Sequence, residues 1–242
     1  MTVMRIFLLF LLSILFVSPR ISWSQEIKEE KDEPVSLGVD LVSRYLWRGL
    51  LYCSSPSIQP YVSYSKSGLT VGSWASYSNL TNYAEVDLYV SYTAGPISLS
   101  VYDYWATGNE GGDYKYFEWD KKETSHQLEA SVIYTGPEGF PAVFTAATFF
   151  YGADLNASSD QNLSTYFEMA YPFKIGQNTT NAFVGFTPAK GIYSDYDFSV
   201  MNIGFNASKE IEISDKFKLP IKATFAVNPA AERVFLVVGF TF

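Results

Sequence analysis

The sequence predicts an all-β protein, an antiparallel up-and-down transmembrane β-barrel of about twelve strands, with ten to fourteen as the range. Three observations predict it. Beyond residue 34, apolar and polar residues alternate with the period of two that is typical of strands, in runs of about ten residues. The links between the runs alternate between short and long. The last run ends the sequence on an aromatic residue, Phe242.

The chain begins with a short apolar segment behind Arg5, which we interpret as a signal peptide over residues 1–24. A retained membrane anchor is the alternative, which the short length of the apolar core disfavours. Residues 25–34 (QEIKEEKDEP) form a charged leader that we expect in the periplasm. The remaining segment, 35–242, is assigned to an outer-membrane β-barrel of a Gram-negative bacterium.

Composition excludes several classes of function. Hydrophobic residues make up 48% of the chain, yet the mean hydropathy is only +0.02, so apolar residues are diluted among polar ones. Without residues 1–24 the chain carries 15 Lys and Arg against 25 Asp and Glu, a net charge of −10, which argues against nucleic acid as a partner. A single cysteine, Cys53, and a single histidine, His126, give no basis for an internal disulfide, a metal site or a cofactor.

The runs have the length of strands that cross a bilayer at a tilt, about 9–11 residues. Short links are expected at 65–68, 93–96, 135–141, 174–179 and 208–216, and longer ones at 49–56, 78–84, 105–124, 152–163 and 188–196. Short periplasmic turns and long external loops are the rule for outer-membrane barrels, so both termini are predicted to be periplasmic. The predicted strands are 36–48, 57–65, 69–77, 85–93, 96–104, 125–135, 141–151, 164–173, 180–187, 197–207, 217–227 and 232–242.

The last strand carries a candidate assembly signal. Alternate apolar residues fall on one face and end at the chain terminus, a pattern typical of strands that the barrel-assembly machinery recognises. A buried C-terminal strand of a secreted β-sandwich is the alternative. The residues of this face are Val234, Leu236, Val238, Phe240 and Phe242.

Strand parity assigns side chains to the lipid or to the lumen, because successive residues point to opposite faces. In the first run, Tyr45 and Trp47 are predicted to face lipid. Elsewhere the same parity places the charged residues inward, with a basic wall from the first and last strands opposite an acidic wall from the middle strands. The predicted pore-lining residues are Arg44, Arg48, Lys218, Lys222 and Arg233 on the basic side and Glu85, Asp87, Glu129 and Glu168 on the acidic side.

Several stretches over residues 36–92 resemble the TorF-type porin family. They are Ser43 to Leu50 (SRYLWRGL), Ser55 to Pro60 (SPSIQP), Ser67 to Leu69 (SGL), Gly72 to Ser76 (GSWAS) and Glu85 to Tyr89 (EVDLY). The step Trp47-Arg48-Gly49 is the most specific of these, whereas Arg44 stands where an acidic residue is expected between Ser43 and Tyr45. The resemblance implies an outer-membrane barrel of the porin type.

These patterns predict a passive channel for small polar or charged solutes. A closed structural or adhesion barrel, filled by an ion-paired network, is the alternative, and the loop at 105–124 bears on the choice because it could fold inward or project outward. We do not expect an enzyme. A lipid hydrolase would need His126 as its base, but Leu128 rather than a serine follows two residues later on the same face.

Overall fold

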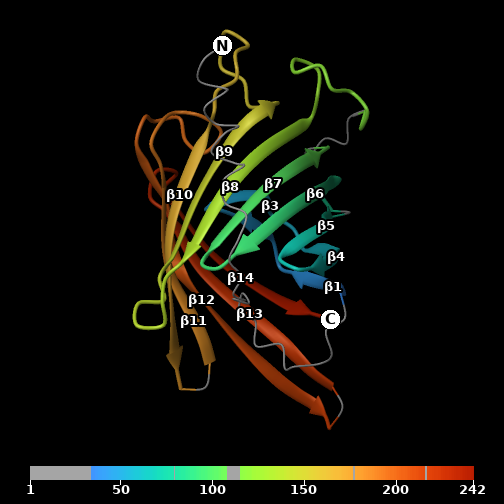
Figure 1. Ribbon diagram of the computed structural model, residues 1–242, viewed down its shortest axis with the longest axis vertical. Helices are drawn as coiled ribbons and strands as arrows, with labels where there is room; N and C mark the ends of the chain where they lie inside the picture. Colours follow the sequence, from blue (N-terminus) through green and yellow to red (C-terminus); the bar gives the residue numbers. More distant parts are fainter. Residues whose placement is uncertain (1–33, 79, 108–114, 177, 216) are drawn as a thin grey trace.

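The computed structural model describes residues 34–78, 80–107, 115–176, 178–215 and 217–242 (Figure 1). The predicted signal peptide and all of the leader except Pro34 lie outside these residues. None of the described residues forms a helix that is long and apolar enough to cross a membrane.

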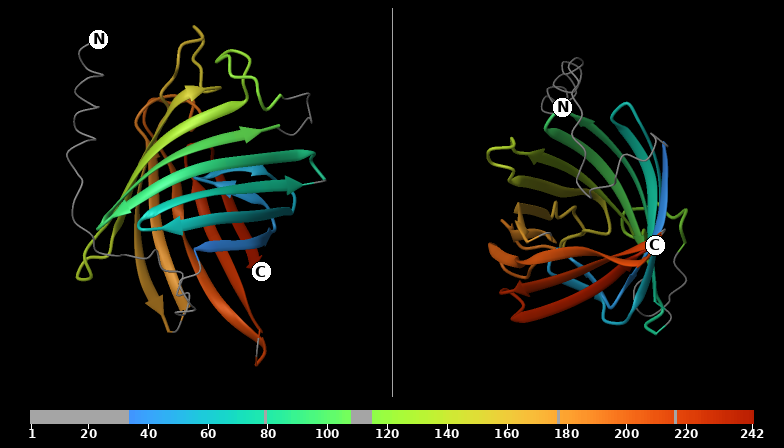
Figure 2. Two further views of the ribbon diagram at one scale, coloured as in Figure 1. Left: turned by 45° about the vertical axis from the view of Figure 1, so that its right-hand side comes forward. Right: turned by 90° about the horizontal axis from the view of Figure 1, so that it is seen from below.

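Twelve antiparallel strands form a closed barrel, which confirms the predicted fold class (Figures 1 and 2). Each strand is hydrogen-bonded to its neighbours in the chain, and β1 closes the barrel by pairing with both β4 and β14. The barrel strands are β1 (Val35–Val42), β4 (Ser57–Lys66), β5 (Leu69–Ser78), β6 (Tyr83–Ala94), β7 (Ile97–Ala106), β8 (His126–Thr135), β9 (Val143–Gly152), β10 (Thr165–Ile175), β11 (Asn178–Thr187), β12 (Ser199–Ser214), β13 (Phe217–Asn228) and β14 (Arg233–Thr241).

The links alternate as the sequence predicts. Those after β4, β6, β8, β10 and β12 are mostly tight turns that lie together at one end of the barrel, the short-turn end. Those after β5, β7, β9, β11 and β13 lie at the opposite, long-loop end, where three of them span 107–125, 153–164 and 188–198 (Figure 1). Consecutive links lie at opposite ends because neighbouring strands run in opposite directions, and the antiparallel pairing of β1 with β14 requires an even number of strands.

The C-terminal strand closes the wall. β14 pairs with β1 over the short register from Asp40↔Thr241 to Val42↔Gly239, and the backbones of Val39 and Phe242 exchange two hydrogen bonds of 3.0 Å. The face predicted as the assembly signal points outward, with Val234 and Leu236 exposed, whereas Phe235 on the other face is buried. The chain terminus is therefore part of the wall.

Large apolar side chains cover the outside of the barrel. Leu88, Val90, Val132 and Met169, which parity predicts to face lipid, are all exposed. Four outward tyrosines lie close to the short-turn end and form a partial aromatic ring around it. These tyrosines are Tyr64, Tyr92, Tyr134 and Tyr171.

The predicted first strand, 36–48, is wrong in its second half. β1 ends at Val42, and the chain then turns into the lumen as a hairpin of β2 (Tyr45–Trp47) and β3 (Leu50–Cys53). Tyr45 and Trp47 do not face lipid, since Tyr45 is buried and Trp47 packs against Tyr104 of the inner wall. The error has a simple cause, because a hairpin inside the lumen shows the same period of two as a strand in the wall.

The tip of this hairpin, the lumenal hairpin, is a two-residue turn. Arg48 and Gly49 both have positive φ, of 49° and 76°, as the tight hairpin turns with two left-handed residues require. Gly49 also lies against β12, where an added Cβ atom would come within 2.0 Å of the Met201 carbonyl oxygen. The Asn228 side chain donates a hydrogen bond of 3.0 Å to the Gly49 carbonyl. The Trp47-Arg48-Gly49 step is thus the point at which the hairpin docks.

Gly49→Ala should weaken this docking. A left-handed backbone costs an L-residue about 1–2 kcal/mol, and the contact with Met201 adds to that cost. We expect the free energy of unfolding, measured by urea titration of the refolded protein in detergent, to fall by at least that amount. Gly139→Ala is the matched control, because nothing lies within 4 Å of its added Cβ. Equal stability of the two variants would contradict the docking.

Candidate functional site in the barrel lumen

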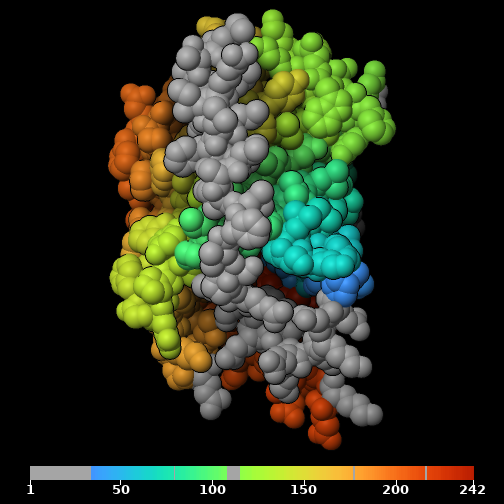
Figure 3. All heavy atoms as spheres, viewed as in Figure 1, coloured from blue at the N-terminus to red at the C-terminus, as the bar shows by residue number. Residues whose placement is uncertain are grey.

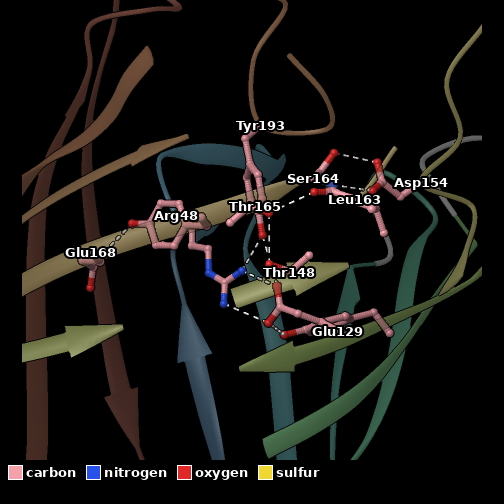
Figure 4. Close-up of polar contacts among 11 residues, drawn as sticks. Arg48, Glu129, Thr148, Asp154, Leu163, Ser164, Thr165, Glu168 and Tyr193 are labelled. Carbon is pink, nitrogen blue, oxygen red and sulfur yellow. Dashed lines mark hydrogen bonds and ion pairs between the residues drawn. The ribbon is translucent and has the colours of Figure 1, made fainter. Parts of the chain in front are cut away.

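An ion pair joins the tip of the lumenal hairpin to the opposite part of the wall. The Arg48 guanidinium donates two hydrogen bonds to the Glu129 carboxylate on β8, from Nη1 to Oε2 at 2.5 Å and from Nη2 to Oε1 at 3.0 Å (Figure 4). Glu129 is only 1% exposed and the Arg48 side chain 14%. A carboxylate buried this deeply requires a charged partner, and the paired, bidentate geometry supplies it.

Two tyrosines complete the coordination of Glu129. The Tyr104 hydroxyl donates to Oε1 at 3.2 Å and the Tyr193 hydroxyl to Oε2 at 3.1 Å. Burial raises the pKa of the Tyr193 hydroxyl well above its ordinary value despite the neighbouring Arg48, so this loop residue remains protonated. Glu129 thus accepts four hydrogen bonds, which come from the hairpin, from β7 and from the 188–198 loop.

Aromatic rings surround the Arg48 guanidinium. Its central carbon lies 4.3 Å from the ring centroid of Trp47, 4.8 Å from that of Tyr166 and 5.8 Å from that of Tyr193. Cation–π contacts of this kind are stronger where water is excluded. They hold the arginine in a cluster whose buried members include Phe149 and Met201.

Two long loops hold Tyr193 in place from above. Asp154 accepts hydrogen bonds from the backbone and the hydroxyl of Ser164, at 2.8 and 2.7 Å (Figure 4). The Ser164 hydroxyl in turn accepts a hydrogen bond of 2.9 Å from the backbone of Ile192. This chain of bonds ties the 188–198 loop to the 153–164 loop and directs Tyr193 into the lumen.

The lumenal hairpin separates two cavities. The larger, of about 540 Å³, opens toward the long-loop end and is called the outer vestibule; the smaller, of about 180 Å³, lies on the short-turn side and is called the inner vestibule. The outer vestibule is lined by Trp47, Leu50, Leu51, Tyr52, Tyr83, Glu85, Tyr104, Ala106, Thr124, Ser125, Gln127, Phe149, Ala153 and Ile192. The inner vestibule includes Asp40, Arg44, Gln59, Lys222 and Thr241.

The predicted opposition of a basic and an acidic wall is not what the lumen contains. Arg48 reaches across and pairs with Glu129, because it lies on the hairpin and not on the wall. Arg44 and Lys222 line the inner vestibule, and Glu85 lines the outer one. The two cations of the inner vestibule are therefore displaced along the barrel axis, and not across it, from the carboxylate of the outer one.

The other predicted lining residues lie nearer the ends or have polar partners. Lys218 pairs with Glu210 at 3.7 Å near the short-turn end, and Arg233 is exposed at the long-loop end. Glu168 accepts hydrogen bonds from Tyr166 and from Asn202, the latter at 3.0 Å. Asp87 is buried beside Glu85 on β6, and no hydrogen-bond partner is found for its Oδ1 atom in the described part of the chain.

The loop between β7 and β8 folds neither into the lumen nor away from the barrel in its described part, residues 115–124. It lies against the outside of the wall, in the green region at the upper right of Figure 3. Trp119 stacks on His126 with 3.8 Å between ring centroids. The ring nitrogens of His126 lie 2.7 Å from an Asp103 carboxylate oxygen and 2.6 Å from the Tyr116 carbonyl oxygen. His126 is thus a fully buried clamp between the wall and the loop.

Sequence reasoning missed Tyr193, Tyr104 and Asp103. Tyr193 lies in a loop, where no strand period assigns a direction. Asp103 lies beside Leu128 on the outer face, which is the face from which charges were expected to be absent. The signal that could have identified it is His126 on the same face, since an isolated acid and base on an apolar surface favour pairing.

The chain belongs to a family described as bacterial proteins of unknown function (Gcw_chp), whose model matches residues 28–218. No curated protein matches it. The family match covers the segment that resembles TorF-type porins, and that finer assignment stays a prediction.

Solved structures with a similar arrangement include porins and an autotransporter. One mutant porin of Rhodopseudomonas blastica is 11% identical with a TM-score of 0.37, over 77% of this chain and 55% of the porin, so the chain spans about half of that protein. Another is 12% identical with a TM-score of 0.39, over 87% and 73%. The β domain of the Bordetella autotransporter BrkA is 12% identical with a TM-score of 0.36, over 86% and 98%. Similarity this low says nothing about function.

Glu129→Ala should leave Arg48 buried without its charged partner, with only the Tyr193 hydroxyl still bonded to it, and the loss of one partner of a buried ion pair typically costs about 3–5 kcal/mol. We expect that loss in the free energy of unfolding, measured by urea titration. The double variant Arg48→Ala/Glu129→Ala should lose less than the sum of the two single variants, because the pair is removed as a unit. Glu138→Ala, in an exposed turn, is the control. Strict additivity would contradict the ion pair.

His126→Leu should release the 115–124 loop from the wall. The variant loses both side-chain hydrogen bonds and the partner of Asp103, so opening of the loop should rise about ten-fold. The measurement is the rate of trypsin cleavage after Lys122. Tyr151→Phe removes only the bond to the Trp119 carbonyl and should have a smaller effect. If trypsin cleaves His126→Leu at the wild-type rate, His126 does not hold the loop against the wall.

Proposed function

We propose that the protein is an outer-membrane β-barrel of a Gram-negative bacterium and that its lumen is a narrow channel for small polar or charged solutes, constricted by the lumenal hairpin. The observation that carries this proposal is the pair of vestibules on opposite sides of the hairpin, one open toward the long loops. A barrel with a filled interior and no path would not need a cavity on each side of the lumenal hairpin.

The outer surface supports the membrane placement. Exposed apolar side chains cover the strands around the barrel, whereas soluble monomers rarely expose apolar patches beyond a few hundred Å². The tyrosines near the short-turn end fit a ring at the membrane–water boundary. With short turns in the periplasm, both termini are periplasmic, in keeping with the predicted signal peptide over residues 1–24.

The outward face of β14 supports recognition by the barrel-assembly machinery. Its exposed Val234 and Leu236 fit an apolar strand face that contacts lipid once the assembly machinery has inserted the barrel. The TorF-type resemblance, which centres on Trp47-Arg48-Gly49, favours a channel over an adhesin, because that step forms the tip of the constriction.

No catalytic role is proposed. The Nε2 atom of His126, which a hydrolase would present to a serine, is 2.6 Å from the Tyr116 carbonyl oxygen, and the ring is covered by Trp119. A base in this position cannot accept a proton from a hydroxyl unless the loop moves away.

Single-channel conductance of the mature chain, residues 25–242, in a planar bilayer tests the channel. We expect a small conductance in the wild type and a larger one in a variant whose hairpin, residues 45–53, is replaced by four Gly and Ser residues. The replacement fits the wall, because Val42 and Ser57 are already paired across β1 and β4. Glu129→Gln, which weakens the docking, should increase the frequency of open events.

Folding is checked in each case by the heat-modifiable gel shift of barrels, with Glu138→Gln as the control. If the wild type and the shortened variant both fold and neither conducts, the channel is excluded. The closed structural barrel is then the function that remains, with the four hydrogen bonds to Glu129 as its permanent seal.

A further inference from the structure

The outer vestibule has a lining that differs from the rest of the lumen. Five aromatic rings line it, and three of them come from separate elements: Tyr52 from the hairpin, Tyr83 from β6 and Tyr104 from β7. The rings of Trp47 and Tyr52 meet at 79°, those of Trp47 and Tyr104 at 62° and those of Tyr52 and Tyr83 at 67°. Rings set at steep angles form the corners of a box rather than a flat stack.

Among the described residues, Glu85 is the one carboxylate that lines this box, and it lacks a cation. Glu85 accepts hydrogen bonds from the hydroxyls of Tyr83 and Tyr45, and neither it nor Asp87 is within ion-pair distance of a lysine, arginine or histidine among the described residues. Arg48, the nearest candidate, is used by Glu129. The two neighbouring carboxyls can share a proton, and a negative charge stays on the pair whenever only one of them is protonated.

The unpartnered Oδ1 atom of Asp87 is a second, independent observation. Asp87 is only 4% exposed, and it lies one inward-facing position beyond Glu85 on β6. Asp87 does not itself line the cavity but adjoins Glu85, which does. Buried polar atoms in native proteins are nearly always satisfied, so this oxygen requires a donor that the described residues do not supply. Uncompensated negative charge favours a positively charged donor over a neutral one.

The size of the cavity selects the kind of cation. A volume of about 540 Å³ lies in the range of small-molecule sites and far exceeds the space that a metal ion occupies. Aromatic faces attract ammonium groups, and the apolar side chains of Leu50, Leu51 and Ile192 offer contacts for attached carbon atoms. We infer that the outer vestibule binds a small organic ammonium ion, held by Glu85 and by the faces of Tyr52, Tyr83 and Tyr104.

This inference rests on the proposed outer-membrane placement, which makes the outer vestibule the external mouth of the lumen. It does not require conduction, so the two proposals fail separately. If the protein binds ammonium ions and never conducts, the channel proposal is refuted and the binding site is supported. If it conducts and does not bind ammonium ions, the channel proposal is supported and the binding site is refuted.

Isothermal titration calorimetry of the refolded mature chain in detergent tests the site. The probe is choline, and the matched neutral ligand is 3,3-dimethyl-1-butanol, which has the same shape without the charge. We expect choline to bind at least about ten-fold more tightly than the alcohol, because only the ammonium group gains from the carboxylate and the ring faces. Equal affinities of the two ligands would overturn the inference. So would the absence of binding heat at choline concentrations up to about 10 mM, ten times an expected Kd of about 1 mM.

Two variants locate the binding. Glu85→Gln keeps the size of the side chain but removes its charge, and its amide can accept a hydrogen bond from only one of the two tyrosine hydroxyls. We expect the affinity for choline to fall by about ten-fold and the affinity for the alcohol to stay the same. Tyr52→Leu should lower the affinity for choline, because the variant lacks one of the ring faces. The heat-modifiable gel shift verifies that the variant is folded. Glu168→Gln is the control, because this lumenal carboxylate is bonded to Tyr166 and Asn202 and lies outside the vestibule lining; its affinity for choline should stay within about two-fold of the wild type. Unchanged choline binding in Glu85→Gln would refute the assignment.

Discussion

The ion pair between Arg48 and Glu129 is the constraint on which the interior of this barrel depends. A single carboxylate on β8 is bonded to the hairpin, to the inner wall and to the 188–198 loop, so three separate segments are positioned by one buried charge. Removing a charge from water is expensive, and the arrangement is stable only when all partners are present together. The hairpin is therefore held in one position rather than resting loosely in the lumen.

This pairing also determines how charge is distributed in the rest of the lumen. Outside the central pair, Glu85 lines the cavity on the long-loop side of the hairpin, while Arg44 and Lys222, together with Asp40, line the cavity on the other side. A charged solute that passes from the outer to the inner vestibule would meet the carboxyl of Glu85 first and the cations Arg44 and Lys222 beyond the constriction. Such an axial field discriminates by the sign of the solute charge at entry, whereas a transverse field mainly orients dipoles.

The wall of the barrel could be predicted from the sequence almost strand by strand, since the period of two, the run length and the alternating links all reflect local constraints. Glu85, Asp87, Glu129 and Glu168 were correctly placed inward for the same reason. The hairpin could not be predicted in this way, because Tyr45 and Trp47 show the alternation of a wall strand. The hairpin differs from a wall strand in its turn, where Arg48 and Gly49 have a left-handed backbone. The sequence shows that a glycine is present but not which φ it adopts.

Long-range contacts limited the prediction of the site more than local structure did. The partner of Arg48 lies 81 residues away and Tyr193 lies 145 residues away, and no pattern along the chain connects them. The contact between His126 and the 115–124 loop was not predicted for a different reason. Parity placed His126 on the face of Leu128, which is the outer face in the structure. The rule that charges avoid the lipid face, however, hid the possibility that a loop covers an outward-facing acid and base.

The short register between β1 and β14 has a consequence for the order in which the molecule is built. Only three residue pairs join these strands, fewer than at any other junction of the barrel, and the hairpin leaves the wall directly beside them at Ser43, whose backbone bonds to Val238. The hairpin cannot reach Glu129 until β8 is in place, nor Tyr193 until β11 and β12 flank its loop. The contacts that dock the hairpin and the pairs that close the wall therefore share one location, and both require the strands from β8 onward to be present.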